Sequence, residues 1–218
     1  GVRFTDFYAS ANVCTPSRAG LLTGRYAIRS GLAHEVIQPS DTTGLPRSEI
    51  TLPQALKPDY ATALFGKWHL GHGPGDLPNA RGFDSSFALD ATGGDNFEKR
   101  PYLPLYKTAD WFEDGKPADL PKDFYSSKFL VDRLIRNIDT APKDGKPFFA
   151  YLPFGATHAP HQAPQDYLDK YRGRYDEGWD VVRQRWYERQ IELGVVDPET
   201  TLAPRNPGVE PWDDLSDN

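Results

Sequence analysis

The chain has 218 residues and a formal net charge of −6, which argues against nucleic acid or an anionic membrane surface as its main partner. Its sequence contains no apolar run long enough to cross a membrane. The single cysteine, Cys14, excludes an internal disulfide. A chain of this length can bury a substantial core, and an acidic chain can still bind an anion where basic side chains gather in one cleft.

The first part of the chain predicts a strand followed by a helix. Residues 2–8 alternate enough for a strand, and Pro16 is tolerated at a first helical position. Gly24 is a natural stop. Cys14 is therefore expected just before a helix N-terminus, where free N–H groups favour an anion, with Arg18 on the same face one turn later. The alternative is a buried structural cysteine.

The next segments predict a loop, a short helix and a buried strand. Residues 27–47 are rich in Gly, Ser, Thr and Pro, which is typical of a surface excursion. Thr51 is a good N-cap for a short helix over residues 51–56. The apolar run at residues 60–65 ends at a glycine and predicts a buried strand. Lys67 and His69 then follow at its carboxyl end, where open α/β sheets bind ligands.

The rest of the chain predicts further alternation of helices and strands. Loops with short strands are expected over residues 72–122, including an Asp-Gly hairpin near residues 111–116. The other expected elements are an amphipathic helix (124–138), a buried strand (148–152), a loop carrying His158 (153–160), an exposed helix (175–193) and a Pro-rich connection (194–218). This order favours a layered α/β domain.

Two runs carry a resemblance to a known family. The first extends from Cys14 to Arg25 and contains Cys-Thr-Pro-Ser-Arg, and the second is Gly-Lys-Trp-His-Leu-Gly at residues 66–71. Together they resemble the sulfatases, and residues 171–193 look like the bacterial arylsulfatases. The resemblance implies an alkaline-phosphatase-like α/β fold with a mixed sheet flanked by helices. It also implies sulfuric ester hydrolysis in a bacterial protein whose compartment, periplasm, exterior or cytoplasm, stays open.

The resemblance assigns roles to five residues. Cys14 is oxidised to formylglycine by a formylglycine-generating enzyme, and its hydrate attacks the sulfate ester of a small-molecule substrate while one oxygen contacts a calcium ion (Ca2+). Arg18 stabilises the hydrate, and Lys67 bridges nucleophile and sulfate. His69 removes a proton so that sulfate is released. His158 binds the ester oxygen and is placed to protonate the leaving alcohol.

The remaining histidines and the calcium ligands fit the family pattern less well. His161 is an alternative to His158, whereas His34 and His72 fit no motif and are expected at the surface. The family's acidic ligands and a second downstream lysine have no clear counterpart, and Asp217-Asn218 is a weak candidate pair. The chain lacks Met and has no closing element. Residues 1–218 are therefore expected to be an internal fragment of the catalytic domain, inactive alone, with the other metal ligands outside it.

Three rival interpretations remain. A phosphonate monoester or phosphodiester hydrolase shares the Cys-x-Pro-Ser-Arg core and the fold. A non-catalytic sulfatase-like protein would only bind anions and would keep Cys14 unmodified. A thiol hydrolase would pair Cys14 with a histidine, but the residues that follow Cys14 give no reason for it.

Overall fold

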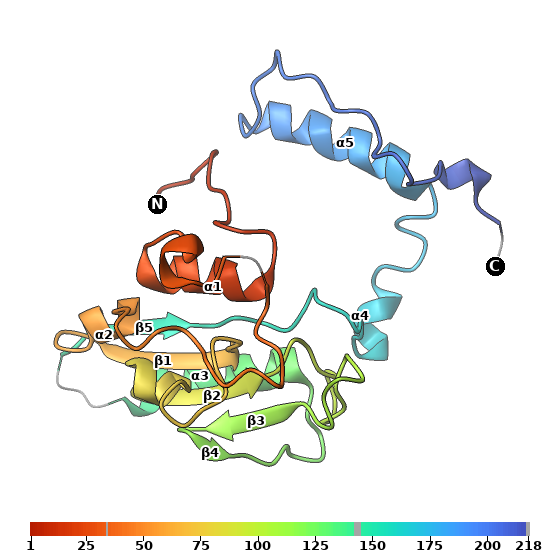
Figure 1. The fold of residues 1–218 in the computed structure, drawn as a ribbon. Helices are drawn as coiled ribbons and strands as arrows, with labels where there is room; N and C mark the ends of the chain where they lie inside the picture. The colour runs from red at the N-terminus through yellow and green to blue at the C-terminus, as the bar shows by residue number, and fades with distance from the viewer. Residues whose placement is uncertain (34, 142–144, 217–218) are drawn as a thin grey trace. The chain divides into compact units, whose positions relative to one another are not determined.

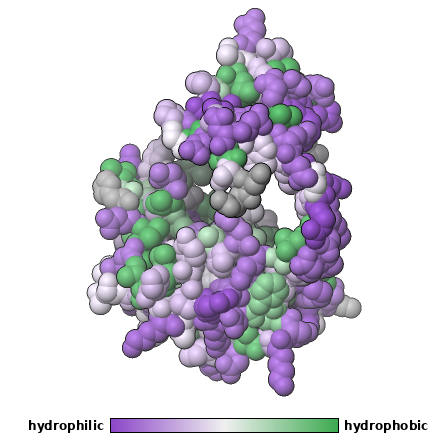
Figure 2. All heavy atoms as spheres, turned by 90° about the vertical axis from the view of Figure 1, so that its right-hand side faces the viewer, coloured by the Kyte–Doolittle hydropathy of each residue, from purple (hydrophilic) through white to green (hydrophobic). Residues whose placement is uncertain are grey.

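The computed structural model describes residues 1–33, 35–141 and 145–216. The chain forms two compact units, one of Ala9–Gln162 and one of Gly1–Tyr8 with Ala163–Asn218. Among the described residues, no helix is both long and apolar enough to cross a membrane. Hydrophilic side chains predominate on the face shown in Figure 2, with hydrophobic ones in scattered patches.

A five-stranded mixed sheet of order β4-β3-β2-β1-β5 organises the larger unit (Figure 1). Its strands are β1 (Ala61–Lys67), β2 (Ser85–Asp90), β3 (Asp110–Glu113), β4 (Lys116–Pro117) and β5 (Phe148–Tyr151). Strand β1 pairs in parallel with β2 and β5, whereas β3 is antiparallel to both β2 and β4. The expected mixed α/β sheet is confirmed.

Helices cover both faces of this sheet because side chains alternate along each strand. Phe65 and Phe87 pack into a core with Leu130 of α3 (Ser126–Thr140). Neighbouring residues such as Leu64 point the other way and pack with Leu22 of α1 (Cys14–Thr23). The sheet is therefore the middle layer of three, which is the arrangement visible in Figure 1.

The helix and turn signals in the sequence account for several elements. Gly24 ends α1 in the left-handed conformation with φ of 66°. Thr51 caps α2 (Leu52–Leu56) in a capping box with Gln54. The hairpin β3–β4 turns at Asp114 and Gly115, both with positive φ, as the Asp-Gly pair predicts. Short 3-10 helices occur at Ala27–Ser30, Pro78–Arg81 and Trp212–Asp214.

Three expectations about the fold need correction. Residues 2–8 form no strand and have exposed side chains, because alternation alone provides no partner for pairing. Strand β5 is only partly buried, with Phe148 55% exposed, since it lies at the sheet edge. The segment 27–47 is not wholly a surface excursion, because Ile37 and Leu45 are buried.

The smaller unit contains α4 (Gln165–Asp169) and α5 (Gly178–Glu192). Helix α5 confirms the exposed helix expected over residues 175–193. Within this unit, Arg3 donates to the carbonyl oxygen of Leu193 at 2.6 Å, and the rings of Trp179 and Trp212 meet edge to face at 5.0 Å. None of the five candidate site residues lies in this unit.

Candidate functional site

Cys14 is the first residue of α1 and is half-buried. Val13 is the N-cap and Pro16 the third helical residue, so the helix begins earlier than expected. Pro16 is still tolerated, because the first four N–H groups of a helix have no partner within it. Cys14 borders a hollow of about 310 Å³, and Arg18 and Tyr151 also line it.

Lys67, the last residue of β1, brings its ammonium group to Cys14. The Nζ atom lies 3.0 Å from Sγ of Cys14 and also donates to the carbonyl oxygen of Thr92. The side chain is almost fully buried, and this burial lowers the pKa of Lys67 despite the hydrogen bond to Cys14. A cation in this position stabilises negative charge on whatever group residue 14 carries.

Arg18 lies on the same helix and lines the same hollow as Cys14. Its Nη1 donates to the carbonyl oxygen of Lys67 at 2.7 Å and lies 3.3 Å from the hydroxyl of Tyr151. Burial raises the pKa of Tyr151, and Arg18 opposes this, so Tyr151 remains a neutral acceptor. Arg18 therefore ties α1 to β1 and β5 while it keeps its charge beside the hollow.

His69 is completely buried and has a left-handed backbone with φ of 59°. Its Nε2 lies 2.9 Å from the carbonyl oxygen of Ile37, which can only accept, so Nε2 carries the proton. The Nδ1 atom is buried and has no partner among the described residues. Burial, followed by the charge of Lys67, lowers the pKa of His69 to about 3. The imidazole is therefore neutral, with Nδ1 as a free acceptor.

His158 lies on the loop after β5, as the sequence predicts. Its Nδ1 lies 2.7 Å from the carbonyl oxygen of Ala159, and its ring packs edge to face on Tyr102 at 5.2 Å. A Cβ at Gly93 would lie 2.9 Å from the His158 ring. His161 is exposed instead. The structure thus joins Cys14, Arg18 and Lys67 by direct contacts, and it connects His158 to Lys67 through the segment of Thr92 and Gly93.

His72 is not the surface residue that the sequence predicts. It is half-buried, with Nδ1 2.7 Å from Oδ2 of Asp90 and Nε2 3.0 Å from the carbonyl oxygen of Gln38. The hydrogen bond to Asp90 raises the pKa of His72 above its ordinary value. His34, the other histidine expected at the surface, lies outside the described residues.

Sequence reasoning also missed two contributors to the site. Thr92 accepts from Lys67 through its main-chain oxygen, which no side-chain pattern reveals. Tyr151 pairs with Leu64 across the sheet, and this pairing carries its hydroxyl to Arg18. The sequence did offer one signal for Tyr151, which is its place near the end of the strand predicted over residues 148–152. This strand pairs in parallel with β1.

A calcium ion does not fit the described residues alone. Among residues 1–33, 35–141 and 145–216, no group of three or more His, Cys, Asp or Glu side chains could hold a metal ion. The charged groups that contact Cys14 and its hollow are the cations Lys67 and Arg18. The candidate pair Asp217 and Asn218 lies outside the described residues.

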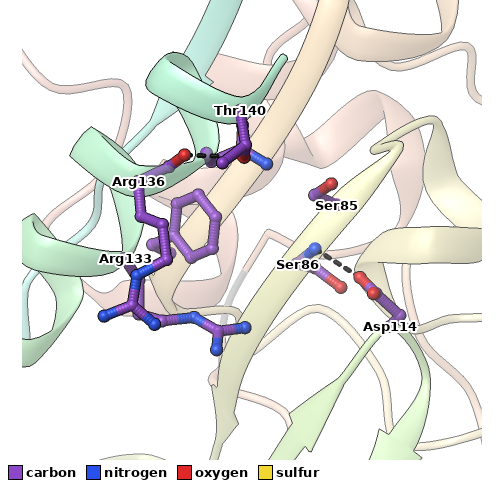
Figure 3. Close-up of a pocket in the computed structure, with 8 residues that line it drawn as sticks. Ser85, Ser86, Asp114, Arg133, Arg136 and Thr140 are labelled. Atoms are coloured by element: carbon purple, nitrogen blue, oxygen red, sulfur yellow. Dashed lines mark hydrogen bonds between the residues drawn. The ribbon is translucent and has the colours of Figure 1, made fainter. Parts of the chain in front are cut away.

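A second hollow, of about 180 Å³, lies between α3, the start of β2 and the β3–β4 turn (Figure 3). Arg133 and Arg136 border it from the helix, and Ser85 and Asp114 from the sheet. This is the amino end of the parallel strands, whereas Lys67 and Cys14 meet at the carboxyl end. Ligands of open α/β sheets bind at the carboxyl ends, so the hollow at Cys14 is the better candidate.

Comparison with known proteins identifies relatives of the chain. The family model described as Sulfatase matches residues 1–205. An uncharacterized sulfatase of Schizosaccharomyces pombe is 37% identical over 99% of this chain and 42% of its own length. An arylsulfatase of Klebsiella aerogenes is 33% identical over 93% of this chain and 45% of its own. The chain thus spans less than half the length of both relatives.

Solved structures agree with the fold. The crystal structure of Ps i-CgsB in complex with k-i-k-neocarrahexaose superposes with a TM-score of 0.65 and 28% identity, covering 75% of this chain and 39% of the other.

Proposed function

The chain belongs to the sulfatase family, and from this premise we propose that the protein containing it is a sulfuric ester hydrolase that acts on small-molecule sulfate esters. The observation that carries the proposal is the 3.0 Å contact between Nζ of Lys67 and Sγ of Cys14. It places a buried cation beside a half-buried residue that borders a hollow. That hollow lies where α/β sheets bind ligands. The relative named arylsulfatase supports the same reaction class.

Cys14 fits the position of a formylglycine made by a formylglycine-generating enzyme. The residue borders an open hollow, and its side-chain atom already contacts the ammonium group that would stabilise an oxygen there. Formylglycine supplies an aldehyde whose hydrate is a nucleophile toward the sulfur of a sulfate ester. Calcium remains part of the proposal through family membership, with acidic ligands from outside the described residues.

The neighbouring cations bind and orient the sulfate. Lys67 bridges the side chain of residue 14 and a sulfate oxygen. Two of its three donors account for the contacts with Cys14 and Thr92, and the third is left for the sulfate. Arg18 keeps the end of β1 in place through the carbonyl oxygen of Lys67 and adds charge to the hollow. These fixed charges need no reorganisation as the substrate reacts.

The two histidines move protons. His69 takes a proton from the second hydroxyl of the hydrated aldehyde, so that sulfate leaves as the aldehyde re-forms. Its acceptor is Nδ1, which is buried, neutral and unpaired among the described residues. His158 donates from Nε2 in its doubly protonated form and is left as the neutral tautomer, whose Nδ1–H donates to the carbonyl oxygen of Ala159. As the S–O bond to the alcohol breaks, its electron pair stays on the oxygen, which takes the proton from Nε2.

Two measurements on natively expressed protein test this proposal. Peptide mass spectrometry should show Cys14 converted, with the mass loss that replacement of the thiol by an aldehyde requires. Aryl sulfate hydrolysis should disappear in Cys14→Ala, with circular dichroism and thermal unfolding unchanged. An active preparation with only unmodified thiol refutes the formylglycine. Faster turnover of aryl phosphonates or phosphodiesters would favour the rival hydrolase, and binding without turnover the non-catalytic protein.

A further inference from the structure

We infer that residues 92–96, which hydrogen-bond to Gln162, form a positioning element. This element fixes the place of the His158 ring relative to the ammonium group of Lys67. The inference rests on the proposed function, since it assigns His158 the proton donor's place. His158 and Lys67 come from different parts of the chain, one from the loop after β5 and one from the end of β1. Both strands deliver their loops to the same end of the sheet (Figure 1). The N–H of Lys67 donates to the carbonyl oxygen of Pro153 at the start of the loop after β5. The place of His158, five residues further along this loop, depends on the contacts that hold the rest of the loop.

The segment contacts both residues. At one end, the carbonyl oxygen of Thr92 accepts from Nζ of Lys67. One residue later, Gly93 lies directly against His158, and its missing side chain is what leaves room for the ring. A Cβ there would lie 2.9 Å from Nδ1 of His158 and 3.1 Å from the carbonyl oxygen of Ala159. The same glycine accepts, through its carbonyl oxygen, the N–H of Tyr102, whose ring packs on His158.

Gln162 holds the far side of the His158 loop. Its Oε1 accepts from the N–H of Asn96 at 2.9 Å, and its Nε2 donates to Oδ2 of Asp95 at 2.8 Å. The side-chain amide of Asn96 reaches back to the carbonyl oxygen of Pro160 at 3.3 Å. Pro160 and Gln162 follow His158 in the chain, so these bonds hold the loop in place on the C-terminal side of His158.

Asp95 and Asn96, which bind Gln162, are themselves held in place. Asp95 and Asn96 are 4% and 5% exposed. Arg100 pairs with Asp95, and the hydroxyl of Ser126 at the start of α3 donates to Oδ1 of Asn96 at 2.6 Å. The element is thus anchored to α3, and a bond lost at Gln162 frees the His158 loop rather than the element.

The geometry also selects the reactive atom of His158. The carbonyl oxygen of Ala159 can only accept, so Nδ1 carries a proton and Nε2 is the atom left for the substrate. Loosening the loop lets the ring turn, and then the donor misses the leaving oxygen. A displacement of about 1 Å costs on the order of a hundredfold in rate where the displaced group acts in the slow step.

The test is the dependence of rate on the leaving group, measured on the full-length protein with a series of aryl sulfates. Gln162→Leu keeps the size of the side chain and removes its amide bonds. Gln184→Leu, on an exposed face of α5 where the amide binds Glu188, is the matched control. We expect Gln162→Leu to lower kcat roughly 10- to 100-fold for phenols of high pKa and far less for nitrophenols, since poor leaving groups need the proton most. Gln184→Leu should follow the parent.

A smaller folded fraction would lower kcat by the same factor for every leaving group. An equal loss of kcat across the series, or no loss, therefore overturns the inference. If Gln162→Leu does not fold, Gly93→Ala displaces the same ring from the other side and is judged by the same criterion. A 15N spectrum recorded at a pH at which the His158 imidazole is neutral reports the tautomer of the ring, and so tests its orientation without substrate. The parent should show protonated Nδ1, and the variant a mixture of tautomers. A parent inactive on every sulfate ester would refute the proposed function instead, and the spectrum would still decide the positioning.

Discussion

Gly66 lies so close to Pro153 that a Cβ on Gly66 would come within 2.1 Å of the carbonyl oxygen of Pro153. That oxygen accepts the N–H of Lys67 at 2.8 Å. The backbone of Gly66 has φ of 140°, a conformation that side chains disfavour. The glycine therefore allows the chain after β5 to reach the end of β1 where Lys67 enters the site.

Gly66→Ala should destabilise the protein by more than strain alone. The unfavourable φ costs about 1–3 kcal/mol, and the clash with the main chain of Pro153 adds to it. Gly24→Ala is the control, because φ there is also positive but nothing lies within 4 Å of the new Cβ. Urea unfolding should give a clearly larger loss for Gly66→Ala. Equal losses would mean that the contact with Pro153 relaxes without cost.

Lys67→Met should separate activity from stability. The substitution removes the buried charge but keeps most of the apolar stem, so relief of desolvation offsets the lost hydrogen bonds. In the full-length protein, aryl sulfate turnover should fall on the order of a hundredfold or more, while the thermal midpoint changes little. Lys57→Met is the control, since Lys57 pairs with Asp84 at the surface and should affect neither quantity much. Turnover at the parental rate would show that Lys67 does not act in the reaction.

The sequence predicted those parts of the fold and site that depend on local signals. The apolar run before Gly66 gave β1, and with it the places of Lys67 and His69. Strand β2 (Ser85–Asp90) lies among the short strands expected over residues 72–122, but it was not located, because two serines follow a stretch rich in Gly, Pro and Asp. Its burial comes from β1 and β3 on either side, which no local pattern reveals.

The contacts of the site were harder to predict than its residues. Ile37 and Thr92 act through main-chain oxygens, and any residue type offers such an oxygen. The burial of His72 depends on Asp90 at the end of strand β2, which the sequence did not locate. The roles of the five site residues stay predictions until they are tested.

His69 should make the folded state sensitive to acid. Its pKa is lowered from 6.5 to about 3 in the folded protein, so between these values the unfolded chain binds a proton that the folded chain does not. The free energy of unfolding then falls as the pH drops through this window, with a slope of at most about 1.4 kcal/mol per pH unit from this residue. Urea unfolding at several pH values measures the slope.

His72 contributes with the opposite sign, because its pKa is raised in the folded state. Its contribution is complete below the unfolded pKa and is lost as the pH rises through the folded one. The comparison of the parent with His69→Gln isolates His69 from this background. The variant should show the shallower loss of stability below pH 6.5, the ordinary pKa of His69. Identical slopes would mean that His69 takes up a proton in the folded protein.

Calcium should bind weakly to residues 1–218 expressed alone, and this chain should show no aryl sulfatase activity. Lys67 and Arg18 repel a cation near Cys14, and within the described ranges no group of acidic, His or Cys side chains compensates. A hard cation needs several converging oxygen ligands. Calorimetric titration is the measurement, with Asp119→Ala as a control at an exposed carboxylate. Micromolar binding that disappears in Asp217→Ala and Asn218→Ala, but not in the control, would instead make that pair true ligands.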